Sequence, residues 1–176
     1  MPARSIPAAV AAQLQRQMNH EYGAAHAYTA LAHWCAEHNL KGFARFFHKQ
    51  SGEEREHAQR FAAHLLDRGT LPELAALPEP VTRFKDVLEV ARHAQKMEQQ
   101  NTRGIQQVLA AALKADDYAA QAALQWFVTE QVEEEAWCAE MVARVALVVN
   151  TPAVMMLDRH IEKLLAEPSG PEGDDD

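Results

Sequence analysis

Glycine and cysteine are scarce in this chain, and it contains no long apolar stretch. Only 7 of its 176 residues are glycine, while alanine, leucine, glutamine and glutamate are abundant, which indicates one compact helical domain with a full core. The two cysteines, Cys35 and Cys138, form no C-x-x-C motif and indicate a reducing, cytoplasmic compartment. No apolar run approaches the roughly 20 residues that span a bilayer, so we expect no membrane segment.

The chain also lacks an excess of positive charge. Its formal net charge is −8, which argues against general binding to nucleic acid or to anionic membranes. A negative protein of this kind attracts cations instead.

Four stretches have the apolar periodicity of long amphipathic helices. In each, the apolar positions recur in steps of three and four, the spacing that faces a partner helix. Each of these buried stripes is interrupted near its middle by residues that can bind a metal, which are Glu21, then Glu54 and His57, then Glu98, then Gln131 and Glu134. Burying a carboxylate is costly unless a positive group lies beside it. Four such carboxylates therefore indicate a bound pair of metal ions.

The interruptions occur at matching heights. Glu21 lies about 19 residues before a turn near residues 39–41, and Glu54 and His57 lie about 14 and 17 residues after it, which puts them level in antiparallel helices that rise about 1.5 Å per residue. Around a second turn near residues 115–117 the counts are similar. Glu98 lies about 18 residues before this turn, and Gln131 and Glu134 lie about 15 and 18 residues after it, so these three are also level.

The chain is thus predicted to form two related helical hairpins. Each contributes one isolated Glu and one i, i+3 pair, and residues three apart share a helix face. One Glu-x-x-His motif alone is more often an exposed surface pair, so it is the combination of motifs that indicates a metal site. It is close to the di-iron carboxylate bundle, with Gln131-x-x-Glu134 in place of a second Glu-x-x-His. Four glutamates balance two divalent cations, and oxygen ligands with one imidazole favour iron or manganese over copper or a structural zinc site.

Helix boundaries follow from capping signals. Ser5 is predicted to cap the first helix, Gly69 to end the second in the left-handed conformation, and Asp86 with Glu89 to form a capping box for the third. Either Asp116 or Asp117 is expected to cap the fourth.

A long connection and a short last helix complete the fold. Residues 70–85 contain three prolines, and at about 3.3 Å per residue they can cover about 50 Å, the length of a helix. A short fifth helix is predicted for residues 152–166, with Pro152 in its first turn. We therefore expect an all-α four-helix bundle domain in residues 1–167 and a disordered acidic tail in residues 168–176.

From about Leu14 to Leu165 the sequence resembles the bacterial non-haem ferritins. The similarity rests on the crossover, the fifth helix and a set of motifs: Gln17-Met18-Asn19-His20-Glu21, Tyr28, Trp34-Cys35, Glu53-Glu54-Arg55-Glu56-His57, Glu98, Leu124-Gln125-Trp126 and Glu130-Gln131-Val132-Glu133-Glu134-Glu135.

The resemblance implies a role for each site residue. Glu21 and His57 would hold a first iron, Glu54 would bridge both irons, and Glu98 and Glu134 would hold the second. Gln131 would support the second iron from nearby, and Tyr28 would be an electron donor or hydrogen-bond partner beside the first. A third, cavity-facing iron site would use Glu53, Glu130 and Glu133, with Glu134 shared.

The resemblance also implies an activity and an assembly. Two Fe(II) ions would bind, dioxygen or peroxide would oxidise them, and the ferric product would enter a mineral inside a shell of 24 subunits. The fifth helix would pack around the four-fold axes, with the acidic tail at the inner surface.

Three alternatives remain open from the sequence. A bacterioferritin would carry a second Glu-x-x-His and a haem-binding Met directly after Glu54, where this chain has Arg55, so we expect no haem. A DNA-protecting mini-ferritin would lack the fifth helix and often carries a basic arm, whereas this N-terminus has only Arg4. A di-iron oxidase of an organic substrate is usually longer and has two Glu-x-x-His motifs.

Overall fold

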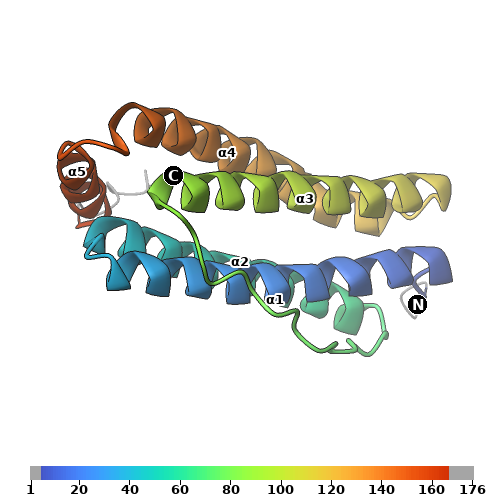
Figure 1. The fold of residues 1–176 in the computed structure, drawn as a ribbon. Helices are drawn as coiled ribbons and strands as arrows, with labels where there is room; N and C mark the ends of the chain where they lie inside the picture. The colour runs from blue at the N-terminus through green and yellow to red at the C-terminus, as the bar shows by residue number, and fades with distance from the viewer. Residues whose placement is uncertain (1–4, 167–176) are drawn as a thin grey trace.

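A computed structural model describes residues 5–166, and this part of the chain contains five helices and no strand. Two antiparallel pairs lie side by side, and a short helix lies across one end (Figure 1). The helices are α1 (Ala8–Glu37), α2 (Lys41–Asp67), α3 (Val87–Lys114), α4 (Tyr118–Val148) and α5 (Val154–Ala166). The predicted four-helix bundle, its long crossover between α2 and α3 and its short fifth helix are confirmed.

Residues with positive φ end three of the helices. Asn39 (φ 60°) and Asp116 (φ 50°) form the tight turns of the two hairpins, and Gly69 (φ 73°) follows α2, as predicted. After Gly69, the backbone N–H of Thr70 donates to the Leu65 carbonyl at 2.8 Å. This 6→1 hydrogen bond satisfies a carbonyl that the end of the helix leaves free.

Aspartates cap α3 and α4. The Asp86 carboxylate accepts a hydrogen bond from the Glu89 N–H at 2.9 Å, as predicted, while the Glu89 side chain reaches back one residue further than in a standard capping box, to the N–H of Lys85. Of the two candidates for α4, Asp117 is the cap, accepting from the Ala120 N–H at 3.2 Å. Asp117 also forms an ion pair with Arg68 at 3.0 Å, which joins the end of α2 to the start of α4.

Two predicted helix starts are wrong. Ser5 does not cap α1, which begins at Ala8 after Pro7 with no side-chain cap. Proline already has the helical φ, and the Pro7 carbonyl accepts hydrogen bonds from the N–H groups of Val10 and Ala11, both at 2.9 Å, so the first turn forms without a side-chain cap. Pro152 lies before α5, which begins two residues later at Val154. The Thr151 hydroxyl accepts from the Ala153 N–H at 3.2 Å and holds residues 151–153 in a turn.

The crossover between α2 and α3 follows α1 along its length (Figure 1). Two amide side chains of α1 hold its backbone. Gln15 donates to the Leu71 carbonyl at 2.8 Å and accepts from the Glu73 N–H at 3.0 Å. One turn later, Asn19 donates to the Glu73 carbonyl and accepts from the Ala75 N–H, both at 2.8 Å. These four bonds attach the extended chain to the helix.

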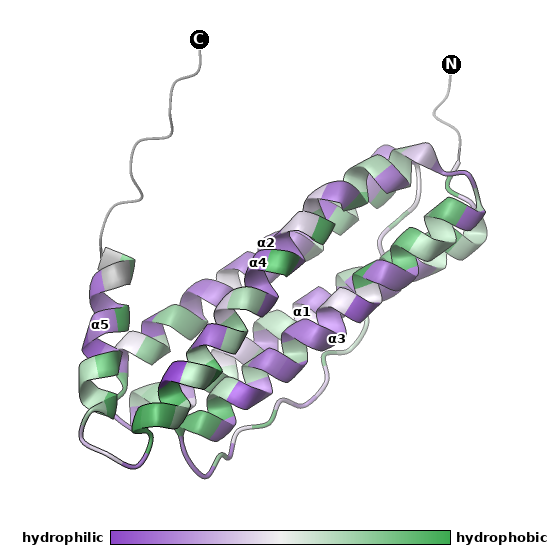
Figure 2. Ribbon diagram, turned by 90° about the horizontal axis from the view of Figure 1, so that it is seen from above, coloured by the Kyte–Doolittle hydropathy of each residue, from purple (hydrophilic) through white to green (hydrophobic). Residues whose placement is uncertain are grey.

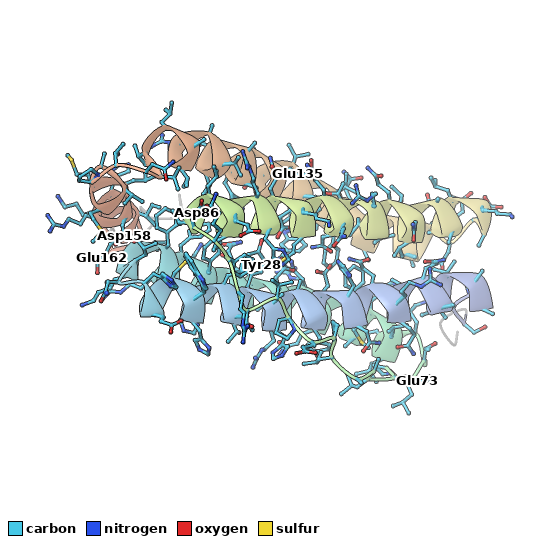
Figure 3. All side chains as sticks on the ribbon, viewed as in Figure 1. Tyr28, Glu73, Asp86, Glu135, Asp158 and Glu162 are labelled. Atoms are coloured by element: carbon cyan, nitrogen blue, oxygen red, sulfur yellow. The ribbon has the colours of Figure 1, made fainter. Side chains whose placement is uncertain are left out.

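Helix α5 packs on the N-terminal end of α2. Asp158, only 3% exposed, accepts a hydrogen bond from the Phe43 N–H at 3.0 Å, so a carboxylate of α5 caps α2. The approach is close because α2 carries a glycine there: a Cβ on Gly42 would lie 2.0 Å from the Asp158 carbonyl oxygen. Exposed Arg45 pairs with Glu162 at 3.0 Å beside this contact. Both acidic residues of α5 are labelled in Figure 3.

The bundle interior has two apolar clusters with a polar layer between them. One cluster, near α5, includes Tyr28, Phe43 and Phe47. The other, at the opposite end, includes Leu14, Phe61 and Ile105. The buried polar residues in the middle of α1 to α4 fall between these clusters, and Figure 2 shows hydrophilic and hydrophobic residues interspersed along each of these helices. The sequence prediction of a polar layer at one height is confirmed.

None of the helices within residues 5–166 is long and apolar enough to cross a membrane. The predicted acidic tail, residues 168–176, lies outside the described residues.

Candidate metal centre

Three predicted ligands converge inside the first hairpin. Glu21 comes from α1, and Glu54 and His57 come from successive turns of one face of α2. Each offers a ligand atom within 4.8 Å of the other two, and the residues are 0%, 1% and 4% exposed. Two carboxylates and an imidazole at this spacing suit a transition-metal ion with mixed oxygen and nitrogen ligands.

The second hairpin brings Glu98 and Glu134 to the same layer. Glu98 is 1% exposed and accepts hydrogen bonds from the Tyr28 hydroxyl and, at 3.3 Å, from Gln131 Nε2. Glu134 is 5% exposed, and its Oε2 accepts from the Trp137 indole and, at 3.1 Å, from Gln50. Both carboxylates therefore lie in fixed orientations.

Burial and mutual repulsion change the protonation of the layer. Burial, followed by the nearby charges of Glu21 and Glu98, raises the pKa of Glu54 well above its usual value. Burial also raises the pKa of Glu21, and burial with the Glu98 charge raises that of Glu134 to about 8. The metal-free layer thus holds protons that a divalent cation would displace.

The imidazole of His57 and the phenol of Tyr28 are neutral. Burial lowers the pKa of His57, so its imidazole has a lone pair free for a metal ion. Burial, then the Glu98 charge, raises the pKa of Tyr28, which therefore keeps its proton and donates it in the hydrogen bond to Glu98.

The residues present fit a pair of bound cations. The side chains hydrogen-bonded to the four carboxyl groups are amides, an indole, a phenol and an imidazole, all neutral groups. Glu21 Oε2 is fully buried and has no hydrogen-bond partner. A buried carboxylate oxygen without a partner is costly, and a metal ion is the group that would satisfy it.

The outer carboxylates predicted for a third iron lie next to this layer. Glu53 forms an ion pair with Lys49, with 2.8 Å between its Oε1 and the lysine Nζ. The pKa of Glu130 is raised by burial and by the charges of Glu133 and Glu53, so these three residues are close enough to interact. Within residues 5–166, however, only Glu21, Glu54 and His57 come within metal-binding distance as a group of three. The third site stays a prediction.

Sequence reasoning missed the side chains that hold the ligands. The helical spacing gives no role to Gln50, Asn101 or Trp137, and Gln17 stands only as part of the motif that ends at Glu21. Each of the four lies three or four residues from a predicted carboxylate, which is a usable signal for a supporting contact. The partner across the bundle, such as Glu134 for Gln50, cannot be read from that spacing.

Comparisons with known proteins agree with this geometry. Residues 11–148 match the family model described as a ferritin-like domain. The chain is 43% identical over 122 residues to the bacterial non-heme ferritin of Staphylococcus haemolyticus, covering 69% of this chain and 74% of that protein. It is also 43% identical over 123 residues to that of Staphylococcus aureus strain MRSA252, covering 70% and 74%.

Solved structures agree as well. An open pore ferritin from the archaeon Archaeoglobus fulgidus superposes with a TM-score of 0.87 at 30% identity, covering 89% of this chain and 96% of that one. A closed form of the same ferritin, engineered by mutagenesis, superposes with a TM-score of 0.86 at 31% identity, covering 90% and 97%. The family match, the relatives and the shared fold show that this chain belongs to the ferritin family.

Proposed function

We propose that this protein stores iron by oxidising Fe(II) to Fe(III) and holding the ferric product as a mineral inside a hollow shell of 24 subunits. The observation that carries the proposal is the buried layer of four glutamates with only neutral donors around them. Burying four carboxyl groups without bound cations lowers the stability of the fold, so we expect this layer to be a binding site for cations. Family membership supports iron as the cation, and Fe(II) is here a substrate.

The ligands divide into two sets. Glu21 and His57 hold the first iron, Glu54 bridges the two, and Glu98 and Glu134 hold the second. Gln131 orients Glu98 through its 3.3 Å hydrogen bond. Tyr28 donates to Glu98, so in the metal-free protein it acts as a hydrogen-bond partner of the second iron's ligand.

The chemistry is a two-electron oxidation. Two Fe(II) ions together supply two electrons, which with two protons reduce O₂ to H₂O₂, or H₂O₂ to water. An oxygen-rich anionic site favours the higher charge of Fe(III) and so promotes electron loss. The protons that the carboxylates hold before iron binds are released as the ions enter.

The ferric product must also leave the oxidation site, and the subunits must assemble into a shell. Glu53, Glu130 and Glu133 form a third iron site on the cavity side and pass ferric ion towards the mineral. Helix α5 packs around the four-fold axes of the shell. A cytoplasmic location accords with the two free, buried cysteines.

The test is an aerobic titration of iron-free protein with Fe(II), following ferric absorbance and then counting the iron that stays with the protein through gel filtration. We expect faster oxidation than in buffer, and retention far above the two or three ions that the ligands of one subunit can hold. Glu140→Gln, a change at an exposed glutamate of α4, serves as a control with wild-type behaviour. Oxidation that stops near two ions per subunit would remove the storage role, and no acceleration over buffer would remove the oxidase site.

A further inference from the structure

Gln17 is a buried amide one turn before Glu21 on α1. It is 3% exposed, and its Nε2 donates two hydrogen bonds, to Glu21 Oε1 at 2.8 Å and to Asn101 Oδ1 at 2.5 Å. Both amide hydrogens are therefore used. The other oxygen of the same carboxylate, Glu21 Oε2, is the buried atom without a partner. Gln17 thus binds one oxygen of Glu21 and leaves the second free.

A glycine on the facing helix provides the space for this amide. A Cβ on Gly104 would lie 1.9 Å from Gln17 Oε1. Gly104 is in the middle of α3, where glycine is about 1 kcal/mol less favourable than alanine. Any side chain at residue 104 would push the amide of Gln17 off its two acceptors.

Asn101 fixes the orientation of the amide. Its Nδ2 donates to Gln131 Oε1 at 3.4 Å, which turns its oxygen towards Gln17. Gln131 in turn donates to Glu98 Oε2 at 3.3 Å. The amides of Gln17, Asn101 and Gln131 form a continuous chain between Glu21 and Glu98, and this chain determines which hydrogens Gln17 presents.

We propose that Gln17 is a positioning residue for the first iron: it holds one oxygen of Glu21 so that Glu21 binds the metal through the other oxygen alone, and residue 104 is glycine because it must leave room for this amide. This inference rests on the proposed function of the same site. Gln17 thereby determines how Glu21 binds the first iron, and it has no ligand of the second iron as a direct partner.

The test uses metal binding without turnover. Metal-free full-length protein is titrated with Co(II) under anaerobic conditions by calorimetry and by d–d absorbance, comparing wild type with Gln17→Met, which keeps the length of the side chain and removes its donor. Loss of a partner that orients a ligand typically weakens binding about 10- to 100-fold, so we expect this loss at one of two sites and an unchanged second site. We also expect weaker d–d bands, because an unrestrained Glu21 can bind through both oxygens and raise the coordination number.

Gln15→Met is the matched control. It makes the same substitution on the same helix and also removes two hydrogen bonds, but these go to the crossover backbone and not to a ligand. We expect wild-type Co(II) affinities and d–d spectra for this variant.

Gly104→Ala tests the space argument without changing Gln17. We expect it to weaken the same site as Gln17→Met does, and to have no further effect when added to Gln17→Ala, which leaves no amide to displace. Thermal melts by circular dichroism establish that each variant is folded.

The outcomes separate the two proposals. Wild-type Co(II) affinities and spectra in Gln17→Met, or equal losses from Gly104→Ala with and without Gln17, would overturn the positioning role alone. A wild-type protein that binds no Co(II) would overturn the proposed function and this inference together.

Discussion

The two hairpins supply the same kinds of residue, yet they build their halves of the site differently. In the α1–α2 hairpin, Glu21, Glu54 and His57 already converge within 4.8 Å. In the α3–α4 hairpin, Glu98 and Glu134 are each held by a side chain of the other hairpin, Tyr28 and Gln50 respectively. The ligands proposed for the first site thus all come from one hairpin, whereas those proposed for the second are held in place by side chains of both.

Glu54→Gln is expected to have the largest effect, because Glu54 is the one ligand proposed to serve both sites. Co(II) binding should weaken at both sites by about 100-fold or more, beyond the usual loss of a supporting residue, and aerobic Fe(II) oxidation should fall to the rate in buffer. Glu98→Gln is the comparison, and it should weaken the second site only. Loss confined to one site in Glu54→Gln would contradict the bridging role.

The protonation of the layer predicts how stability depends on pH. The pKa of Glu134 rises from its usual value of 4.5 to about 8 on folding, and those of Glu21 and Glu54 rise too. The folded protein therefore binds more protons than the unfolded chain between these values, so unfolding becomes easier as pH rises.

Thermal melts of metal-free protein from about pH 6.5 to about pH 8 check this, above the range in which the histidines whose pKa burial lowers, His20, His57, His64 and His93, act in the opposite direction. Each kcal/mol corresponds to about 2–4 °C in Tm for a domain of this size. Tm should fall with rising pH. Saturating Co(II) should reverse this trend, because the metal replaces the protons. A metal-free Tm that rises with pH would show that the carboxylates are ionised at neutral pH without a cation.

Tyr28→Phe tests the dependence of the second site on the first hairpin. It removes the phenol that donates to Glu98 and keeps the ring that stacks on Phe47 with centroids 6.0 Å apart. We expect about 10-fold weaker Co(II) binding at the second site and no change at the first. A loss of affinity at the first site instead would place Tyr28 with the other iron.

Asp158→Ala and Asp86→Ala are expected to have the smallest effects, and they compare the hairpins away from the metal layer. Asp158 caps α2 from α5 and is buried, whereas Asp86 caps α3 locally and is partly exposed. Caps contribute about 0.5–2 kcal/mol, so we expect about 2 kcal/mol for Asp158 and about 1 kcal/mol for Asp86. Urea unfolding measures both, with metal binding unchanged. Equal losses would mean that the contact with α5 adds nothing to α2.

Periodicity was sufficient to predict the layer itself. Steps of three and four showed which face of each helix is buried, and counting from the turns showed that Glu21, Glu54, Glu98 and Glu134 lie at one height. Local capping was equally accessible at Gly69 and Asp86, because those signals act within a few residues.

Contacts between distant residues could not be predicted in this way. Nothing near Leu40 indicates that Asp158, over a hundred residues later, caps α2, and the spacing of Gln17 gives no information on Gly104. The failed cap at Ser5 has a related cause, since a proline two residues later replaced it. Which face is buried follows from local sequence, whereas the atom that lies opposite depends on packing.

The attachment of the crossover has a consequence for how freely this segment can change. Gln15 and Asn19 bind its backbone N–H and C=O groups, as a neighbouring β-strand would, and make no demand on its side chains. Leu71 and Leu74 are 76% and 74% exposed there. Between Leu71 and Ala75 the path of the crossover is thus set through its backbone, so substitutions at Leu71 or Leu74 are expected to leave the bundle beneath unchanged.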